Sequence, residues 1–438
     1  MVHSQSIYLL GKKERSPSFR AYHQLIETCA SEGDFLSFET TLDWLSCYQR
    51  DAQPIHNKLP LIVFRPHALV NIAPFLRVCE QMAIPVTVRC GGTGLTGSCV
   101  PSKEGIILLT GHFKQIKNYE ENKGTICIEP GVTIRQLNQH VAAGEWHFPL
   151  SMATEGVAGI AGCLSQQSRG YHQQQEAMFD VIEGVKLVDG QGQILDVPAP
   201  LVCGAEGLWG IIIEINMKLR RRLSQHQTFL YSGSWQEILN QLPLLRSLQT
   251  LKSVIGFQNQ FYLELTGENW RVPIAATYLE KHLPGIQPMA TSLDQFSQAF
   301  LPSRQTFVVL SSVFHSQQLP EAQRWAIEQA HVLQLDCIWL ADLLAGSLHL
   351  ILQTKEMPDD FACQMQEFLV LWADFVDRRQ GSLASCHGVG MQMRPYMPPF
   401  WTEESQRIWR NLQALFDPKS LFGKEHFFPM EGKSLERI

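Results

Sequence analysis

The sequence predicts an α+β protein built from more than one domain. Its 438 residues are enough for two or three domains, each with a sizeable core. Up to about residue 222, short apolar strands alternate with turns and short helices. Longer helical stretches rich in Gln and Leu follow, with apolar strands such as Thr306–Ser311 and Ser347–Leu352. This change predicts a domain boundary at the basic cluster Arg220–Arg222.

The first half supplies strands and helices in a regular order. An apolar strand over Leu59–Phe64 precedes a helix for which Asn71 is the expected N-cap. Asp189-Gly190 is the turn of a hairpin. The remaining elements expected here are strands over Ile84–Val88, Ile106–Leu109, Thr125–Ile128 and Ile211–Leu219, a helix over Ile134–Ala142, and hairpin strands over Val185–Val188 and Ile194–Val197.

A glycine-rich loop follows the strand Ile84–Val88: Arg89-Cys-Gly-Gly-Thr-Gly-Leu-Thr-Gly-Ser98. Four glycines within seven positions let backbone N–H groups approach an anion closely, because no Cβ atom stands in the way. The loop therefore predicts a site for a phosphate-bearing cofactor.

Part of this loop, Gly92–Gly97, satisfies the dinucleotide pattern G-x-G-x-x-G. That pattern must open a helix to bind a nicotinamide dinucleotide. Here Pro101 and the apolar run Gly105–Leu109 follow, so the context is strand–loop–strand. A nicotinamide-dinucleotide fold is therefore disfavoured.

Composition disfavours several other classes. A net charge of −6 and a pI near 6.2 argue against a nucleic-acid partner. No apolar run reaches transmembrane length, and the N-terminus lacks the basic region of a signal peptide. Eleven scattered cysteines without a C-x-x-C pair fit a reducing compartment. We expect a cytoplasmic protein, and a peripheral membrane contact through Arg220–Arg222 stays open.

Five further motifs follow the loop, and in this order they resemble the FAD-dependent 2-hydroxy-acid dehydrogenase family. That family includes the FAD subunits of glycolate oxidase, D-lactate dehydrogenase and D-2-hydroxyglutarate dehydrogenase. The resemblance covers roughly residues 45–430. The motifs are Ile160-Ala-Gly-Cys-Leu-Ser-Gln-Gln-Ser-Arg-Gly170, Gly204-Ala-Glu-Gly-Leu-Trp-Gly-Ile211, Gly346-Ser-Leu-His349, Cys386-His-Gly-Val-Gly390 and Asp417-Pro418.

The resemblance implies three parts. Residues 1–222 would form an FAD-binding domain of the vanillyl-alcohol-oxidase (PCMH) type, and residues 223–380 an α+β cap. Residues 381–438 would return to the flavin domain with the Cys-His-Gly motif. The cofactor-binding residues implied are Arg89, Cys90, Gly91, Gly92, Thr93, Gly94, Leu95, Thr96, Gly97, Ser98, Thr154, Gly162, Ser165, Gly170, Glu206, Gly207 and Ile211.

Several positions depart from the family pattern. Cys90 and Ser98 replace family glycines, and Arg169 stands where the family has the first of two paired glycines. We expect FAD to bind with different contacts along this second segment. Cys90 abuts the phosphate end of the loop, which is the wrong end for a covalent link to the flavin ring, so we predict non-covalent FAD.

The resemblance implies oxidation of a 2-hydroxy acid of the D-lactate or glycolate type to the 2-oxo acid. Hydride would pass to flavin N5, and electrons onward to a quinone or another acceptor. This chemistry needs a base at the hydroxyl and a cation at the carboxylate. His387 is the candidate base, because a titrating imidazole suits proton transfer near pH 7. Arg304 and Arg394 are candidates for the carboxylate, since guanidinium offers a bidentate fork.

The family often binds a divalent metal, zinc or manganese. The positions that match its ligands are Asp342, His349 and Cys386. Such a set is softer than the family's own and would favour zinc. The Asp-Gly-Asn centre of the family motif is also missing here, which favours loss of the metal.

Two other functions remain open. One is a non-catalytic or electron-transfer FAD subunit, with a second flavin subunit or an iron–sulfur subunit as partner. The other is a flavin oxidase of a different alcohol or a sugar.

Overall fold

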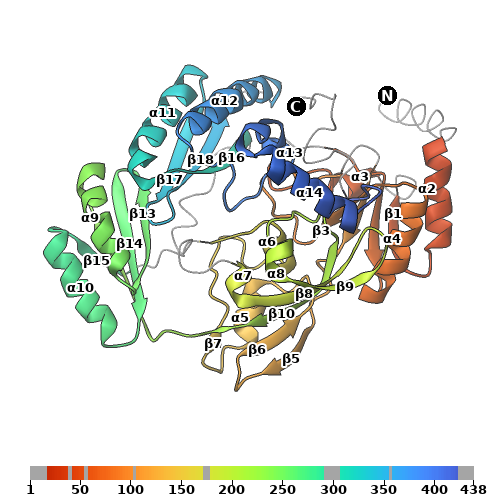
Figure 1. The fold of residues 1–438 in the computed structure, drawn as a ribbon, viewed down its shortest axis with the longest axis horizontal. Coiled ribbons are helices and arrows are strands. Elements are labelled where there is room, and N and C mark those ends of the chain that lie inside the picture. Colours follow the sequence, from red (N-terminus) through yellow and green to blue (C-terminus); the bar gives the residue numbers. More distant parts are fainter. Residues whose placement is uncertain are drawn as a thin grey trace.

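The computed structural model describes residues 17–37, 42–53, 58–101, 105–170, 178–290, 306–354 and 358–422. Three main sheets and the helices packed on them confirm the α+β prediction. The two smaller sheets lie together in the N-terminal half of the chain, and a seven-stranded sheet lies beside them (Figure 1).

The first sheet has the order β1-β2-β4-β3, and both β2 and β3 run parallel to β4. Its core includes Phe64 stacked on Phe75, with ring centroids 3.9 Å apart. Asn71 does not cap the following helix with its side chain and instead donates a hydrogen bond to Glu32. The elements are α2 (Pro17–Thr28), β1 (Gly33–Ser37), α3 (Leu42–Ser46), β2 (Ile62–Pro66), α4 (Ile72–Gln81), β3 (Val86–Arg89) and β4 (Ile106–Leu109).

The glycine-rich loop leaves β3 and leads to the parallel strand β4. Within residues 90–101, which the structure describes, the loop contains no helix. The strand–loop–strand prediction is therefore confirmed over this range.

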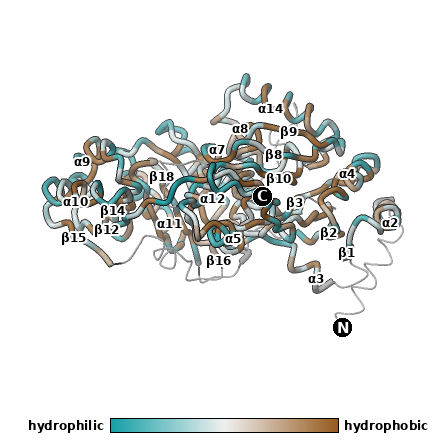
Figure 2. The backbone as a smooth tube through the Cα atoms, turned by 90° about the horizontal axis from the view of Figure 1, so that it is seen from below, coloured by the Kyte–Doolittle hydropathy of each residue, from teal (hydrophilic) through white to brown (hydrophobic). Residues whose placement is uncertain are grey.

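The second sheet is antiparallel, with the order β5-β6-β10-β8-β9. Its strands β8 and β10 are neighbours in the sheet and lie side by side in Figure 2. Thr133 and Gln136 form a capping box that starts α5. The elements are β5 (Ile116–Glu120), β6 (Thr125–Ile128), α5 (Ile134–His140), β7 (Trp146–His147), α6 (Ile160–Ser165), α7 (Met178–Val181), β8 (Ile182–Val188), β9 (Ile194–Pro198), α8 (Ala199–Val202), β10 (Ile211–Lys218) and β11 (Arg220–Arg221).

The cap sheet, β12 to β18, is antiparallel and has the order β15-β12-β14-β13-β17-β18-β16. Helices α9 to α12 pack against one of its faces (Figure 1). The elements are β12 (Gln225–Tyr231), α9 (Trp235–Ser247), β13 (Leu251–Phe257), β14 (Gln260–Gly267), α10 (Arg271–His282), β15 (Gln287–Met289), β16 (Thr306–Val313), α11 (Leu319–Val332), β17 (Asp336–Asp342), β18 (Ser347–Thr354) and α12 (Pro358–Arg378).

The C-terminal segment crosses back onto the N-terminal half. It carries α13 (Gly390–Met393) and α14 (Glu403–Phe416). Gly190 donates a backbone hydrogen bond to Phe416 of this segment. Asp417 then accepts backbone hydrogen bonds from two residues that follow it, Leu421 at 2.7 Å and Phe422 at 2.8 Å. The motif near the start of this segment is held against the glycine-rich loop by Thr96, which donates to His387 O at 3.3 Å and accepts from Gln392 N at 3.2 Å.

Candidate active site

A cavity of about 490 Å³ lies between the N-terminal half and the cap sheet. One wall consists of the glycine-rich loop, residues of the segment 152–170, and the turn at Glu206 and Gly207. The facing wall comes from strands β13, β16, β17 and β18 of the cap and from Cys386 and His387. Segments far apart in the sequence therefore enclose one space.

Buried residues before the glycine-rich loop fix its shape. Asp51 accepts hydrogen bonds from the backbone N–H groups of Gly97 at 2.6 Å and Gln53 at 2.9 Å. The Gln53 amide donates to Leu95 O of the loop and, at 3.2 Å, to Val309 O of the cap. Burial raises the pKa of Asp51 to about 6. The sequence analysis missed both roles because these residues belong to no local motif.

Arg89 supports the loop from behind. Its Nη1 donates to Arg50 O at 2.8 Å, and its guanidinium lies over the Tyr48 ring. At Gly92, where φ is +68°, a Cβ atom would lie 2.5 Å from Arg89 Nη2. The positive φ favours glycine here, and a larger residue would also displace the guanidinium. Arg89 is not among the residues that line the cavity.

Small residues make up much of the rest of the cofactor wall. Thr154, Gly162, Ser165 and Gly170 all line the cavity. At Gly207, where φ is +81°, a Cβ atom would meet no atom within 4 Å. The backbone here borders open space that a cofactor can approach closely.

Most of the predicted cofactor-binding residues come together in this wall. Four do not line the cavity: Arg89, Thr96, Gly97 and Ile211. Thr96 instead touches the C-terminal motif, donating from Oγ1 to His387 O at 3.3 Å. The predicted residues that line the cavity are Cys90, Gly91, Gly92, Thr93, Gly94, Leu95, Ser98, Thr154, Gly162, Ser165, Gly170, Glu206 and Gly207.

Glu206 joins the two halves of the site. Its two carboxylate oxygens accept backbone hydrogen bonds from Val389 and from Gly390, the latter at 2.8 Å. Burial raises the pKa of Glu206, while these N–H groups and the Arg394 charge oppose the rise. Glu206 is therefore a positioning residue for the loop that carries His387.

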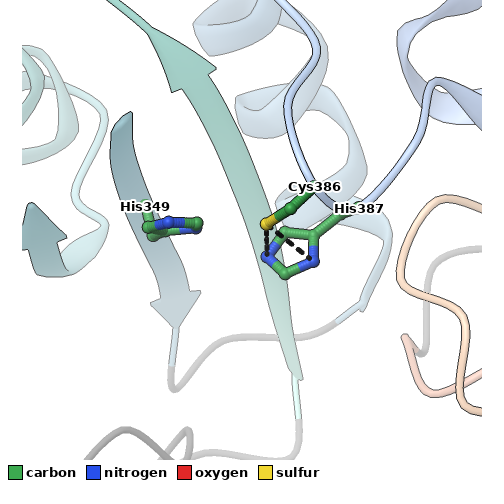
Figure 3. A group of neighbouring side chains, drawn as sticks. All are labelled: His349, Cys386 and His387. Carbon is green, nitrogen blue, oxygen red and sulfur yellow. Dashed lines mark hydrogen bonds between the residues drawn. The ribbon is translucent and has the colours of Figure 1, made fainter. Parts of the chain in front are cut away.

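His387 faces the cavity beside Cys386, and His349 of β18 faces both (Figure 3). The Cys386 Sγ atom lies 3.9 Å from Nδ1 and 4.0 Å from Nε2 of His387. The two imidazole rings are 5.4 Å apart, edge to face. Ser347 hydrogen-bonds His349 Nε2 at 3.2 Å, which orients that ring.

Proton affinities differ sharply within this group. Burial lowers the pKa of His349 to about 3, with a further contribution from His387, so this ring is neutral. Burial also opposes the charged forms of the other two side chains, but their mutual attraction prevails. It raises the pKa of His387 and lowers the pKa of Cys386.

His349, Cys386 and His387 could together hold a metal ion, since their donor atoms lie within 4.8 Å of one another. Asp342 does not join them: its Oδ1 accepts hydrogen bonds from Leu344 and Ala345 in the β17–β18 turn. Thiolate and imidazole donors favour soft ions such as zinc over manganese. The donors present therefore fit a soft ion and not the hard one.

Neither of the two arginines predicted to bind the substrate carboxylate is found lining the cavity in the part of the chain that the structure describes. Arg304 lies outside the described residues. Arg394 does not line the cavity, and its charge acts on Glu206. Arg169 does line the cavity, and among the described lining residues it is the one Lys or Arg side chain.

Two family models match the chain in succession. The FAD binding domain model matches residues 60–198, and the model of the C-terminal domain of FAD linked oxidases matches residues 292–424. The chain belongs to the FAD-linked oxidoreductases. Its cofactor is FAD. The unpartnered Oε1 of the cavity-lining residue Gln166 and the open backbone at Gly207 fit a ligand of this kind.

Curated relatives of this oxidoreductase come from the D-lactate, D-2-hydroxyglutarate and glycolate group. The D-2-hydroxyglutarate dehydrogenase of Stutzerimonas stutzeri is 22% identical over 89% of this chain and 95% of its own. The glycolate oxidase subunit GlcD of Bacillus subtilis is 26% identical over 42% of each chain.

Solved structures confirm the fold of this oxidoreductase. A p-cresol methylhydroxylase superposes with a TM-score of 0.78, covering 93% of this chain and 98% of its own at 13% identity. The 4-ethylphenol oxidase of Gulosibacter chungangensis gives 0.73, covering 94% and 98%, again at 13% identity. These proteins belong to the PCMH and vanillyl-alcohol-oxidase type. In the part of the chain that the structure describes, every helix is too short or too polar to cross a membrane.

Proposed function

We propose that the protein oxidises a 2-hydroxy acid to the 2-oxo acid and passes the electrons to a quinone or another acceptor. The observation that carries this proposal is His387, held at the cavity against the glycine-rich loop that is expected to bind FAD. When bound, FAD supplies the acceptor for the hydride that leaves the substrate Cα.

His387 is the base in this proposal. A ring nitrogen of neutral His387 takes the hydroxyl proton, the Cα–H pair leaves as hydride, and the hydroxyl oxygen becomes a carbonyl. Glu206 and Thr96 keep the loop of His387 at the cavity through hydrogen bonds to its backbone. This places the base without using its ring nitrogens.

Turnover in this proposal does not require a metal. His349, Cys386 and His387 would hold a soft ion, which would polarise a hydroxyl oxygen. However, an ion held by all three would occupy a ring nitrogen of His387 and so compete with its work as base. Zinc is therefore expected to inhibit, and EDTA to leave the rate unchanged.

Arg169 is our candidate for the substrate carboxylate or, alternatively, for a cofactor phosphate. Both are anions that a guanidinium binds well. Arg169→Met separates the two sources. Weaker acid binding with full FAD content assigns Arg169 to the substrate, and loss of FAD assigns it to the cofactor.

The proposal is tested by the visible spectrum of the purified protein under anaerobic conditions. Glycolate and the D- and L-forms of lactate and 2-hydroxyglutarate are added one at a time. Bleaching of the flavin band by one acid supports the proposal. A flavin band that no hydroxy acid of any size bleaches rejects the proposal and favours the second candidate, a partner-dependent FAD subunit.

The specific observation behind that second candidate is the replacement of the family's metal-ligand residues at Asp342 and Cys386.

Acid precipitation of the same sample tests non-covalent attachment. The Cys90 thiol points to Pro130 O at 3.6 Å, and burial raises its pKa. We therefore expect all of the flavin to remain in the supernatant.

A further inference from the structure

We propose that the substrate carries a bulky apolar group beside its oxidised carbon, and that the cap sheet binds this group. This inference rests on the proposed function, because it names the substrate class of the same site. It predicts 2-hydroxy acids with a branched aliphatic or an aromatic side chain in preference to short or dicarboxylic ones.

The cap-strand side chains that line the cavity are almost all apolar. Side chains alternate between the two faces of a strand, and one face of this sheet packs against α9 to α12. The other face borders the cavity. Of the described cap-strand residues that line the cavity, His349 is polar and the other five are aliphatic or aromatic: Ile255, Phe307, Val309, Leu340 and Ile351.

These five side chains form one continuous surface. In the strand register Val309 lies opposite Ile351, and Leu340 lies opposite His349. The surface therefore runs across β16, β18 and β17 to Ile255 of β13, and His349 lies within it. A substrate whose hydroxyl meets His387 would extend its side chain along this surface.

The matched FAD binding domain does not include this wall. That match spans residues 60–198, with the glycine-rich loop and the segment 152–170, whereas the wall comes from β13, β16, β17 and β18. Phe307, Val309 and Leu340 are only half-buried, so part of their apolar surface is open to the cavity. Glycolate has no side chain to cover this surface, and a second carboxylate would lose its hydration against it.

Substrates of graded size test the inference. Anaerobic stopped-flow measures the flavin reduction rate divided by Kd for glycolate, lactate, 2-hydroxybutanoate, 2-hydroxy-4-methylpentanoate and 3-phenyllactate, with 2-hydroxyglutarate as a polar acid of similar size. We expect an increase of about fourfold for each buried methylene. 2-Hydroxyglutarate should lie well below 2-hydroxy-4-methylpentanoate.

Variants of the cap wall test whether the preference for bulky apolar substrates comes from these side chains. Phe307→Ala and Leu340→Ala should each lower the ratio of 3-phenyllactate to lactate by about tenfold or more. Leu230→Ala is the matched control, because Leu230 is half-buried in the apolar cluster on the cap sheet but does not line the cavity. It should leave the ratio unchanged. An equal loss in all three variants overturns the assignment of the wall.

The outcomes separate this inference from the proposed function. Reduction that is fastest with glycolate or 2-hydroxyglutarate overturns the apolar substrate but keeps the hydroxy-acid dehydrogenase. Reduction by long-chain or benzylic alcohols, with none by the acids, keeps the apolar wall and rejects the acid. Absence of reduction by any of these compounds in FAD-loaded protein overturns both.

Discussion

The two walls of the cavity are built in opposite ways. The cofactor wall consists largely of backbone and small side chains from a few contiguous segments, with Gly207 bordering open space. The cap wall consists of single side chains, one or two from each of four strands. A backbone cradle binds what is common to flavoproteins, whereas projecting side chains can differ from one substrate to the next. Changes in the first wall should therefore abolish cofactor binding, and changes in the second should leave it intact.

The largest effect is expected from Gly207→Val. The side chain would project into the space that FAD needs, so we expect loss of the flavin and of all activity, measured by the visible flavin band. The left-handed backbone, φ +81°, adds a folding cost of about 1–2 kcal/mol.

Gly285→Val is the control for that strain. Gly285 has φ +87° and equally open surroundings, but it lies in the cap away from the cavity. It should unfold at a similarly lowered temperature and keep its FAD. Equal flavin loss in both variants would mean that strain, not a filled cradle, is responsible.

His387→Asn should distinguish loss of catalysis from loss of cofactor binding most clearly. The variant keeps a polar side chain but has no base, so we expect flavin reduction to slow by about 10²–10⁴-fold. FAD content should match the wild type, because the backbone cradle is untouched. Rapid-mixing reduction with the best acid measures the effect, and an unchanged rate would remove His387 from the mechanism.

The sequence predicts the first wall far better than the second. Several glycines within a few adjacent residues predict an open backbone that can bind an anion. The loop after β3 could therefore be identified from the sequence as a cofactor site. Asp51 and Gln53 were missed because their partners, Gly97 and Val309, are distant in the sequence. Strand alternation alone cannot say which apolar face meets a helix and which meets a cavity.

The candidate metal ligands show the same limit. Motif position joined Asp342 to His349 and Cys386, whereas the chain folds Asp342 into a turn and brings His387 in its place. A set of metal ligands depends on which side chains lie close together in space. A single sequence gives only the order of these residues along the chain.

Glu206→Gln tests the contact that joins the walls. A glutamine has one acceptor oxygen where Glu206 uses two, so one of the Val389 and Gly390 N–H groups loses its partner. A shift of the His387 loop by about 1 Å would slow flavin reduction by up to about a hundredfold. FAD content and substrate Kd should change little. A variant that loses FAD instead would show that Glu206 belongs to the cradle.

The smallest effect should come from Cys386→Ser, as a displaced pH profile. Burial lowers the pKa of His387, but the neighbouring Cys386 raises it above its ordinary value, and neutral His387 is the active form. The wild-type rate should therefore rise with pH through this raised pKa. A serine hydroxyl carries no charge, so the pKa of His387 falls. The rise of the rate with pH, which is the acid limb of the pH profile, therefore moves to lower pH. Below the wild-type pKa the variant should then reduce flavin faster than the wild type, and above it the two should agree.

Cys99→Ser, which alters another thiol at the cavity, is the control. It should not shift the pH range over which the rate rises. An acid limb that stays in place in Cys386→Ser would mean that the thiol does not set the proton affinity of the base.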